Sequence, residues 1–209
     1  MASASSGRQL ASFPKNQSLF LGGGRFKRKK LKMSRPKNPN LVKLITSLIT
    51  GEDDIIKPVL KKLEARLGSV DILSERLDFS HTDYYRDEMG ERLFRKIASF
   101  EKLIKPDELA DIKLFTNSVE DEHLKENRKR TINIDPGYIS MEKMVLASCK
   151  NFAHRIYLKK GIYADLTLIY RADSFQPLEW TFPDYAEDSM IRLLNGVRER
   201  YVHQLQNGG

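Results

Sequence analysis

Residues 153–171, AHRIYLKKGIYADLTLIYR, decide the C-terminal part of the predicted fold. Two runs in which apolar and polar residues alternate flank residues 159–161, Lys-Lys-Gly, a loop with glycine where a bulged hairpin requires a positive φ. The alternation therefore predicts a β-hairpin. Its expected cross-strand pairs are Leu158–Ile162, Tyr157–Tyr163 and Arg155–Asp165.

Strand pleating divides the side chains of this hairpin between two faces. The apolar face, which we expect in the core, carries Ile156, Leu158, Ile162, Ala164, Leu166 and Leu168. The polar face carries Arg155, Tyr157, Tyr163 and Asp165. Two interpretations of the polar face stay open: a solvated surface with a cross-strand ion pair, or a binding-site floor with Arg155 as a fork for carboxylate or phosphate. His154 falls near the edge of the apolar face, where we expect a buried, hydrogen-bonded imidazole, with a general base as the other interpretation.

The segment after the N-terminal tail predicts a strand–helix–strand unit. Residues 41–49, LVKLITSLI, are β-branched and apolar on both faces, as in an interior strand. Residues 56–67 place their apolar side chains on one helical stripe, which Gly68 is placed to end. Residues 70–79 predict the second strand.

The helical period is clearest over residues 88–104. Five apolar side chains share one face there: Met89, Leu93, Ile97, Phe100 and Ile104. Further elements are expected at residues 112–115 (a short strand), to about residue 126 (a polar helix), at residues 131–134 (a strand ending in the turn Asp135-Pro136-Gly137), from Ser140 through Cys149 to Phe152 (a helix) and at about residues 188–205 (a helix). The fold class is therefore α/β: a mixed β-sheet flanked by helices, with a βαβ start and a C-terminal β-hairpin plus helix. An α+β arrangement is the alternative.

The net charge of +8 is unevenly distributed. Residues 1–32 hold eight basic residues and no acid, so 28 bases and 28 acids balance from Met33 onward. We expect residues 1–32 to be a basic disordered extension. It is interpreted as a nucleic-acid or anionic-surface binder, a transit peptide or, the interpretation we favour, a translated leader before a start at Met33. Residues 33–209 are expected to form a single α/β domain, whose balanced charge predicts no phosphate-backbone footprint.

The sequence lacks the motifs that are typical of several classes of function. The lone Cys149 excludes an internal disulfide and a Cys-based zinc cluster, and on an apolar stripe it is expected to be buried rather than reactive. The chain has no phosphate loop and no H-E-x-x-H, G-x-S-x-G or G-x-G-x-x-G segment, and its four scattered histidines predict no metal site. No apolar run approaches the roughly 18 residues of a membrane span. We expect a cytoplasmic protein without membrane contact.

Two further segments supply candidate site residues. Asn133 and Asp135 share a strand face just before the expected turn, and Tyr138 follows it. Ligands gather beyond the carboxyl ends of strands in α/β sheets, so this turn predicts a pocket edge, while a tight turn capped by Asp135 is equally open. Residues 79–85 join a strand to the expected helix and carry Asp83, Tyr84 and Tyr85.

Six segments, in this order along the chain, form a specific combination. They are Met33-Ser34-Arg35-Pro36-Lys37; Thr82-Asp83-Tyr84-Tyr85 with Glu88-Met89-Gly90; Lys113-Leu114-Phe115-Thr116-Asn117; Asn133-Ile134-Asp135-Pro136-Gly137-Tyr138; His154-Arg155-Ile156-Tyr157-Leu158; and Trp180-Thr181 with Pro183-Asp184-Tyr185. Together they resemble the prokaryotic domain of unknown function 4416 family, from Met33 to about Tyr201. The resemblance implies no established activity. Some members carry a GTP-binding label, but this chain has neither the phosphate loop nor the N-K-x-D segment that such binding uses.

The leading hypothesis is a small-molecule or nucleotide-type ligand site, with catalysis left open. The expected ligand-binding residues are Tyr84, Tyr85, Asn133, Tyr138, Arg155, Tyr157, Tyr163 and Asp165, and the candidate catalytic residues are Asp83, Asp135 and His154. The hypothesis requires the polar face of the hairpin and Asp135 to line one concavity. The alternatives are an RNA-binding module, with the tyrosines as a stacking platform and nucleic acid held only through the basic tail, and a non-catalytic interaction scaffold. The sequence specifies neither a cofactor nor an oligomeric state.

Overall fold

The computed structural model describes residues 34–79, 86–90, 92–125 and 129–207. The chain divides into two units, Met1–Lys37 and Asn38–Gly209. In the first unit, the described residues 34–37 form neither helix nor strand, and the expectation for residues 1–32 lies outside the described residues. All the elements below belong to the second unit.

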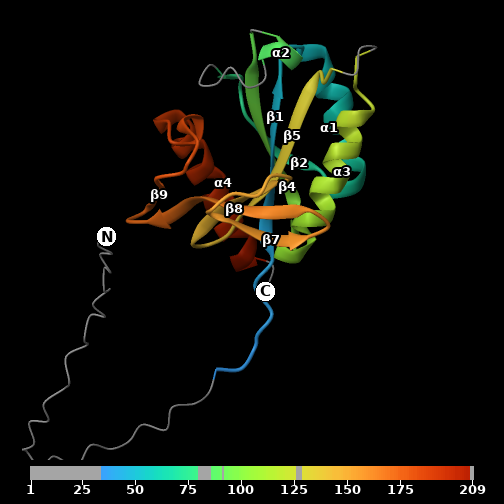
Figure 1. Ribbon diagram of the computed structural model, residues 1–209. Helices are drawn as coiled ribbons and strands as arrows, with labels where there is room; N and C mark the ends of the chain where they lie inside the picture. Colours follow the sequence, from blue (N-terminus) through green and yellow to red (C-terminus); the bar gives the residue numbers. More distant parts are fainter. Residues whose placement is uncertain (1–33, 80–85, 91, 126–128, 208–209) are drawn as a thin grey trace, which may run out of the picture. The chain divides into compact units, whose positions relative to one another are not determined.

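The second unit is built on a nine-stranded sheet (Figure 1). Seven strands follow one another in the order β2-β4-β1-β5-β6-β8-β7, while β3 pairs with β4 and β9 with β8. Every ladder within the described ranges is antiparallel. The strands are β1 (Val42–Thr50), β2 (Val70–Leu73), β3 (Leu77–Asp78), β4 (Phe94–Ile104), β5 (Ile132–Ile139), β6 (Lys143–Ser148), β7 (Arg155–Lys159), β8 (Ile162–Arg171) and β9 (Ser174–Pro177).

Helices cover both faces of this sheet, which confirms the predicted sheet flanked by helices (Figure 1). Because the described ladders are antiparallel, the arrangement is the α+β alternative. Helices α1 (Ile56–Leu67) and α3 (Leu109–Asp121) pack on one face, named here the α1–α3 face, and α4 (Asp188–Asn207) packs on the other, the α4 face. A short helix, α2 (Arg86–Met89), precedes β4. No helix in the described part of the chain is both long and apolar enough to cross a membrane.

The predicted interior strand is confirmed as β1, whose nine residues are all buried between β4 and β5. Its side chains alternate between the two cores: Leu44 and Leu48 pack with α1, and Ile45 packs with α4. The predicted helices at residues 56–67 and about 188–205 are also confirmed. The strand–helix–strand start is present as β1–α1–β2, with β4 inserted between its two strands.

The helix predicted over residues 88–104 is wrong. Among the described residues of this segment, Arg86–Met89 form the short helix α2 and residues 94–104 form β4. Phe94 and Phe100 pack on the α1–α3 face, while Ile97 packs on the α4 face. In a strand that is buried on both faces, apolar and polar residues need not alternate. The apolar residues of this segment therefore matched a helical stripe. Pairing with β1 and β2 holds the segment as a strand.

Four other sequence predictions are wrong. Residues 112–115 lie in helix α3, and residues 143–148 form strand β6 instead of a helix. The Asp135-Pro136-Gly137 segment is no turn, because β5 continues straight through it along β1. Cys149 consequently follows a strand and is exposed, not buried on a helical stripe.

The predicted hairpin is confirmed as β7 and β8, with Arg155 opposite Asp165 and Tyr157 opposite Tyr163. The Leu158–Ile162 pair is wrong, since a bulge places Lys159 opposite Ile162. On β8, Ile162 is buried and Ala164 and Leu166 are partly buried beside α3. Leu168, predicted on the same face, is buried on the α4 face instead, because a bulge in the β6–β8 ladder lies between Leu166 and Leu168. On β7, which ends the sheet, Ile156 and Leu158 are 71% and 37% exposed, contrary to prediction.

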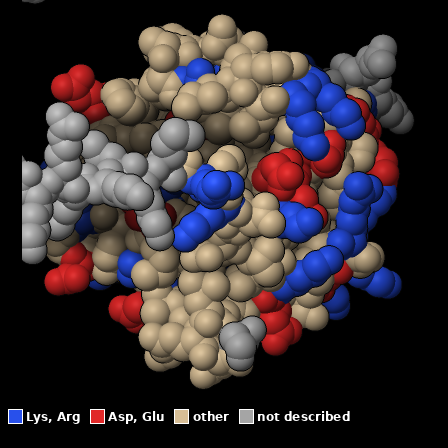
Figure 2. All heavy atoms as spheres, turned by 90° about the horizontal axis from the view of Figure 1, so that it is seen from below, with Lys and Arg blue, Asp and Glu red and all other residues tan. Residues whose placement is uncertain are grey.

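Charge on the second unit is mixed in sign. On the face seen from below, Figure 2 shows lysines and arginines lying among aspartates and glutamates, with broad uncharged areas between them. Some charged side chains of the described ranges form ion pairs near the surface, for example Lys159 and Lys160 with Asp111. This surface accordingly presents no field of a single sign.

Candidate ligand-binding cleft

The sheet splits between β5 and β6. The two strands pair only where Gly137–Ile139 lie opposite Met144–Leu146. Proline lacks an N–H to donate to a ladder, and Pro136 stands where this ladder ends. A cleft of about 750 Å³ opens there, lined by residues of the α4 face and by residues of α3 from the opposite face.

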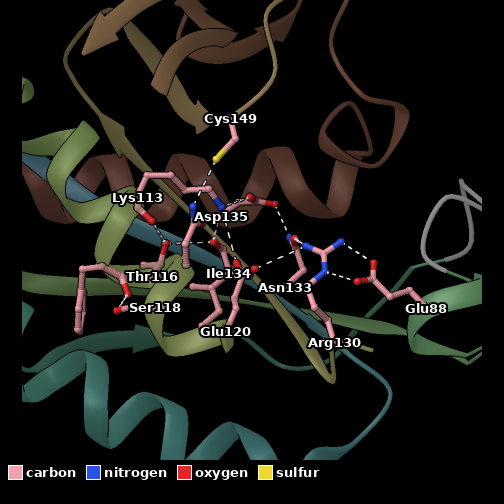
Figure 3. A network of polar contacts seen from close by, with 12 residues as sticks. Glu88, Lys113, Thr116, Ser118, Glu120, Arg130, Asn133, Ile134, Asp135 and Cys149 are labelled. Carbon is pink, nitrogen blue, oxygen red and sulfur yellow. Dashed lines mark hydrogen bonds and ion pairs between the residues drawn. The ribbon is translucent and has the colours of Figure 1, made fainter. Parts of the chain in front are cut away.

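The side chain of Lys113, which belongs to α3, lines the cleft at the split between β5 and β6 (Figure 3). Its Nζ donates hydrogen bonds of 2.9 Å to the carbonyl of Ile134 and to Oδ1 of Asp135, and lies 3.7 Å from Oε1 of Glu120. The side chain is 5% exposed. Burial lowers the pKa of Lys113, but the two carboxylates outweigh burial and raise it above its ordinary value. The amine is therefore a fixed ammonium and not a nucleophile at neutral pH.

The pKa values of the two carboxylates are shifted in opposite directions, although Lys113 lowers both. Burial raises the pKa of Asp135, yet Lys113 outweighs this effect and the net pKa is lowered. For Glu120 burial is the dominant cause, and its pKa is raised in spite of Lys113. Asp135 is thus an ionised hydrogen-bond acceptor and a weak base, whereas Glu120 loses its proton at a higher pH than a solvated glutamate does.

A second cation, Arg130, continues this network (Figure 3). Its Nε and Nη2 donate to the two oxygens of Glu88 at 2.8 and 2.6 Å, and its Nη1 donates to Oδ1 of Asn133 at 3.0 Å. Asn133 in turn donates to Oδ2 of Asp135 at 2.5 Å. Both oxygens of Asp135 are therefore held, one by Lys113 and one by Asn133, which fixes the direction of this carboxylate in the cleft.

Arg95 of β4 lines the cleft on the α4 face. It is 4% exposed, and its guanidinium lies 4.8 Å from the ring centroid of Phe79 and 4.5 Å from that of Tyr185. Its Nη1 forms an ion pair with Asp184, but within the described ranges its Nε has no hydrogen-bond acceptor. Burial raises the pKa of Tyr185 to about 12, so that hydroxyl keeps its proton and can act as a donor.

The hairpin contributes the opposite edge of the cleft. Arg155 donates from Nε to Oδ2 of Asp165 at 2.7 Å and from Nη1 to the Ser148 hydroxyl at 3.0 Å. The same Asp165 oxygen lies 3.3 Å from Nε2 of His154. The His154 ring stacks on Trp180 at 5.1 Å between centroids, and it does not line the cleft. Asp165 thus fixes Arg155 with its guanidinium at the cleft.

Four of the predicted site residues line this one cleft: Asn133, Asp135, Arg155 and Asp165. Others lie elsewhere. Tyr138 packs on the α1–α3 face, and Tyr157 packs edge-to-face on Tyr163 at 5.4 Å outside the lining. The predictions for Asp83, Tyr84 and Tyr85 lie outside the described residues.

Sequence reasoning missed Arg95, Lys113, Asp184 and Tyr185. The available signal was a single cation inside an apolar run, as at Lys113 between Ile112 and Leu114. Such a position predicts either a boundary of an element or a buried charge with partners. In the part of the chain that the structure describes, no group of three or more potential ligands is placed to hold a metal ion.

The fold and the cleft define an α+β protein whose antiparallel sheet opens at a buried network of charges. The model of the domain of unknown function (DUF4416) matches residues 40–201, and the chain belongs to this family. No curated protein and no solved structure matches the chain.

Because the pKa of Glu120 is raised, its burial opposes stability at neutral pH. A group with a raised folded pKa contributes its full stability below its ordinary value, 4.5 for this carboxyl, and loses it as the pH rises through the folded pKa. We expect Glu120→Gln to raise the free energy of unfolding at pH 7, because the amide carries no charge to bury. The gain should vanish at pH 4, as measured by urea unfolding at both pH values. If the variant is less stable than the wild type at pH 7 but not at pH 4, the ionised carboxylate of Glu120 stabilises the fold and the expectation is wrong.

Proposed function

We propose that the protein binds a small anionic molecule in the cleft between β5 and β6, with nucleotides among the candidates. The observation that carries this proposal is the buried Arg95. Its Nε lacks an acceptor in the described part of the chain, although a buried donor without a partner costs about 1–3 kcal/mol, and more for a charged group. An oxyanion at this position would accept the hydrogen bond and offset that cost.

The dimensions and lining of the cleft support the proposal. Small-molecule sites commonly enclose about 300–1,000 Å³ and combine apolar walls with a few fixed polar groups. This cleft has about 750 Å³. Phe152 and Phe182 line it although they are 64% and 47% exposed, so each offers apolar area to a ligand. The fixed polar groups are Asp135 and Arg155.

The RNA-binding alternative has less support. Tyr157 and Tyr163 pack against each other at an interplanar angle of 69°, so they do not form parallel stacking surfaces. The face in Figure 2 mixes acidic with basic side chains, whereas phosphate backbones are bound by basic patches.

A thermal-shift screen against anionic metabolites tests the proposal. A ligand at 100 times its Kd should stabilise the wild type by about 2.7 kcal/mol. The double variant Arg95→Met/Asp184→Asn should lose this response, because it removes the buried guanidinium without leaving its partner charged. The matched control is Lys159→Met/Asp111→Asn, which removes an exposed pair and should respond like the wild type.

Equal stabilisation of the Arg95→Met/Asp184→Asn variant and the wild type by the same ligand would remove Arg95 from the site. Loss of the response in the control variant as well would place the site outside the cleft.

A further inference from the structure

We infer that the ligand of this cleft carries one compact oxyanion, a carboxylate or a phosphate monoester, together with hydroxyl or amine donors, and is not a polyphosphate. This inference rests on the proposed binding function and specifies its ligand. It follows from the ion pairs that most of the charges lining the cleft already form within the protein.

Three of the cations have carboxylate partners within the protein. Lys113 lies between Asp135 and Glu120, Arg130 forks the two oxygens of Glu88, and Arg155 is bound to Asp165. Their charges stabilise these carboxylates and leave little net attraction for an incoming anion.

Arg95 also has a carboxylate partner, Asp184, but in the described part of the chain it differs from these three cations because its Nε has no acceptor. Its charge faces Asp184, but its Nε keeps an unused donor beside the Tyr185 ring. This donor can bind one oxygen of a carboxylate or of a phosphate group. The site is thus built for a single oxyanion.

Additional negative charges on the ligand would be repelled by the carboxylates that line the cleft. Five acidic residues line the cleft against five basic ones: Glu120, Asp121, Asp135, Asp165 and Asp184 against Arg95, Lys113, Arg130, Lys150 and Arg155. A polyphosphate would place its further charges near these acids without a net positive field to balance them. Sites for polyphosphates instead gather backbone N–H groups, lysine and a metal ion around the phosphates.

The same carboxylates supply the second half of the recognition. Asp135 accepts one hydrogen bond at each oxygen, and a carboxylate has about four acceptor positions. Its side chain is 29% exposed and lines the cleft, so the remaining positions are accessible. A hydroxyl or amine of the ligand would donate to them, while the oxyanion accepts from Arg95.

Three simple anions test this inference on the wild-type protein: acetate, inorganic phosphate and tripolyphosphate. Binding is followed by ¹⁵N-resolved NMR through the Nε–H resonance of Arg95, assigned by its absence from Arg95→Met/Asp184→Asn. We expect acetate or phosphate to shift this resonance, and the one that binds more tightly distinguishes a carboxylate from a phosphate ligand. Tripolyphosphate should bind less than about tenfold more tightly than phosphate, because its added charges gain nothing.

Tripolyphosphate binding at the Arg95 resonance with an affinity more than about tenfold above that of phosphate would overturn the inference and leave the binding function intact. If none of the three anions shifts the Arg95 resonance, the single-oxyanion ligand is also refuted. The proposed binding function is tested separately. It stands if the thermal-shift screen finds a ligand whose stabilising effect is lost in a cleft variant.

Discussion

Replacing Lys113 with methionine is expected to lower the free energy of unfolding by about 3–5 kcal/mol, the usual effect of removing one partner of a buried ion pair. The substitution keeps the apolar stem of the side chain and removes the ammonium. Asp135 and Glu120 then face each other in the split with no cation between them. Urea unfolding of the wild type and the variant at pH 7 measures the difference.

Two further variants make the Lys113 experiment specific. Lys159→Met removes a half-exposed lysine that pairs with Asp111, and it should change stability far less. Adding Glu120→Gln to Lys113→Met should recover part of the loss, since one of the two opposed carboxylates disappears. A loss below about 1 kcal/mol for Lys113→Met alone would mean that the network does not hold the split together.

The second large effect is expected for Gly137→Ala, which should destabilise the protein by about 1–3 kcal/mol or more. A Cβ at this position would lie 2.5 Å from the backbone oxygen of Val145 and 2.7 Å from Cδ2 of Leu146. Backbone cannot move aside as a flexible side chain can, so β5 and β6 must separate. Because this pairing closes the cleft, the variant should also lose ligand-induced stabilisation.

Gly196→Ala provides the matched control. Gly196 lies within α4, and an added Cβ there meets no atom within 4 Å. Alanine should therefore stabilise the helix by about 0.5–1 kcal/mol. Equal effects of the two substitutions on the melting temperature would contradict the close approach of β5 and β6 at Gly137.

Sequence patterns predicted the elements whose environment is uniform along their length. The continuously apolar run of β1 specifies burial on both faces, and the single stripes of α1 and α4 specify one buried side. The prediction for β4 failed because helices bury both of its faces and its extended structure comes from pairing with β1 and β2, and local periodicity contains neither kind of contact. The turn predicted around Pro136 was wrong. Pro136 marks the end of the β5–β6 ladder, and Gly137 allows a close contact between the two strands.

The same limits explain how much of the cleft was predictable. Arg155 and Asp165 could be paired because hairpin register follows from the loop between the strands. Arg95 and Lys113 could not be placed, since the first lies on a strand predicted as a helix and the second on a helix predicted as a strand. Their approach to Asp135 depends on the split in the sheet.

The central claim is that Arg95 binds the anionic group of a ligand in the cleft. A crystal structure of the protein with a ligand from the thermal-shift screen tests this claim most directly. We predict an oxygen of the ligand about 2.7–3.2 Å from Nε of Arg95, with a hydroxyl or amine of the ligand at Asp135. A ligand bound elsewhere, or a cleft ligand that leaves Nε of Arg95 without an acceptor, would contradict the account.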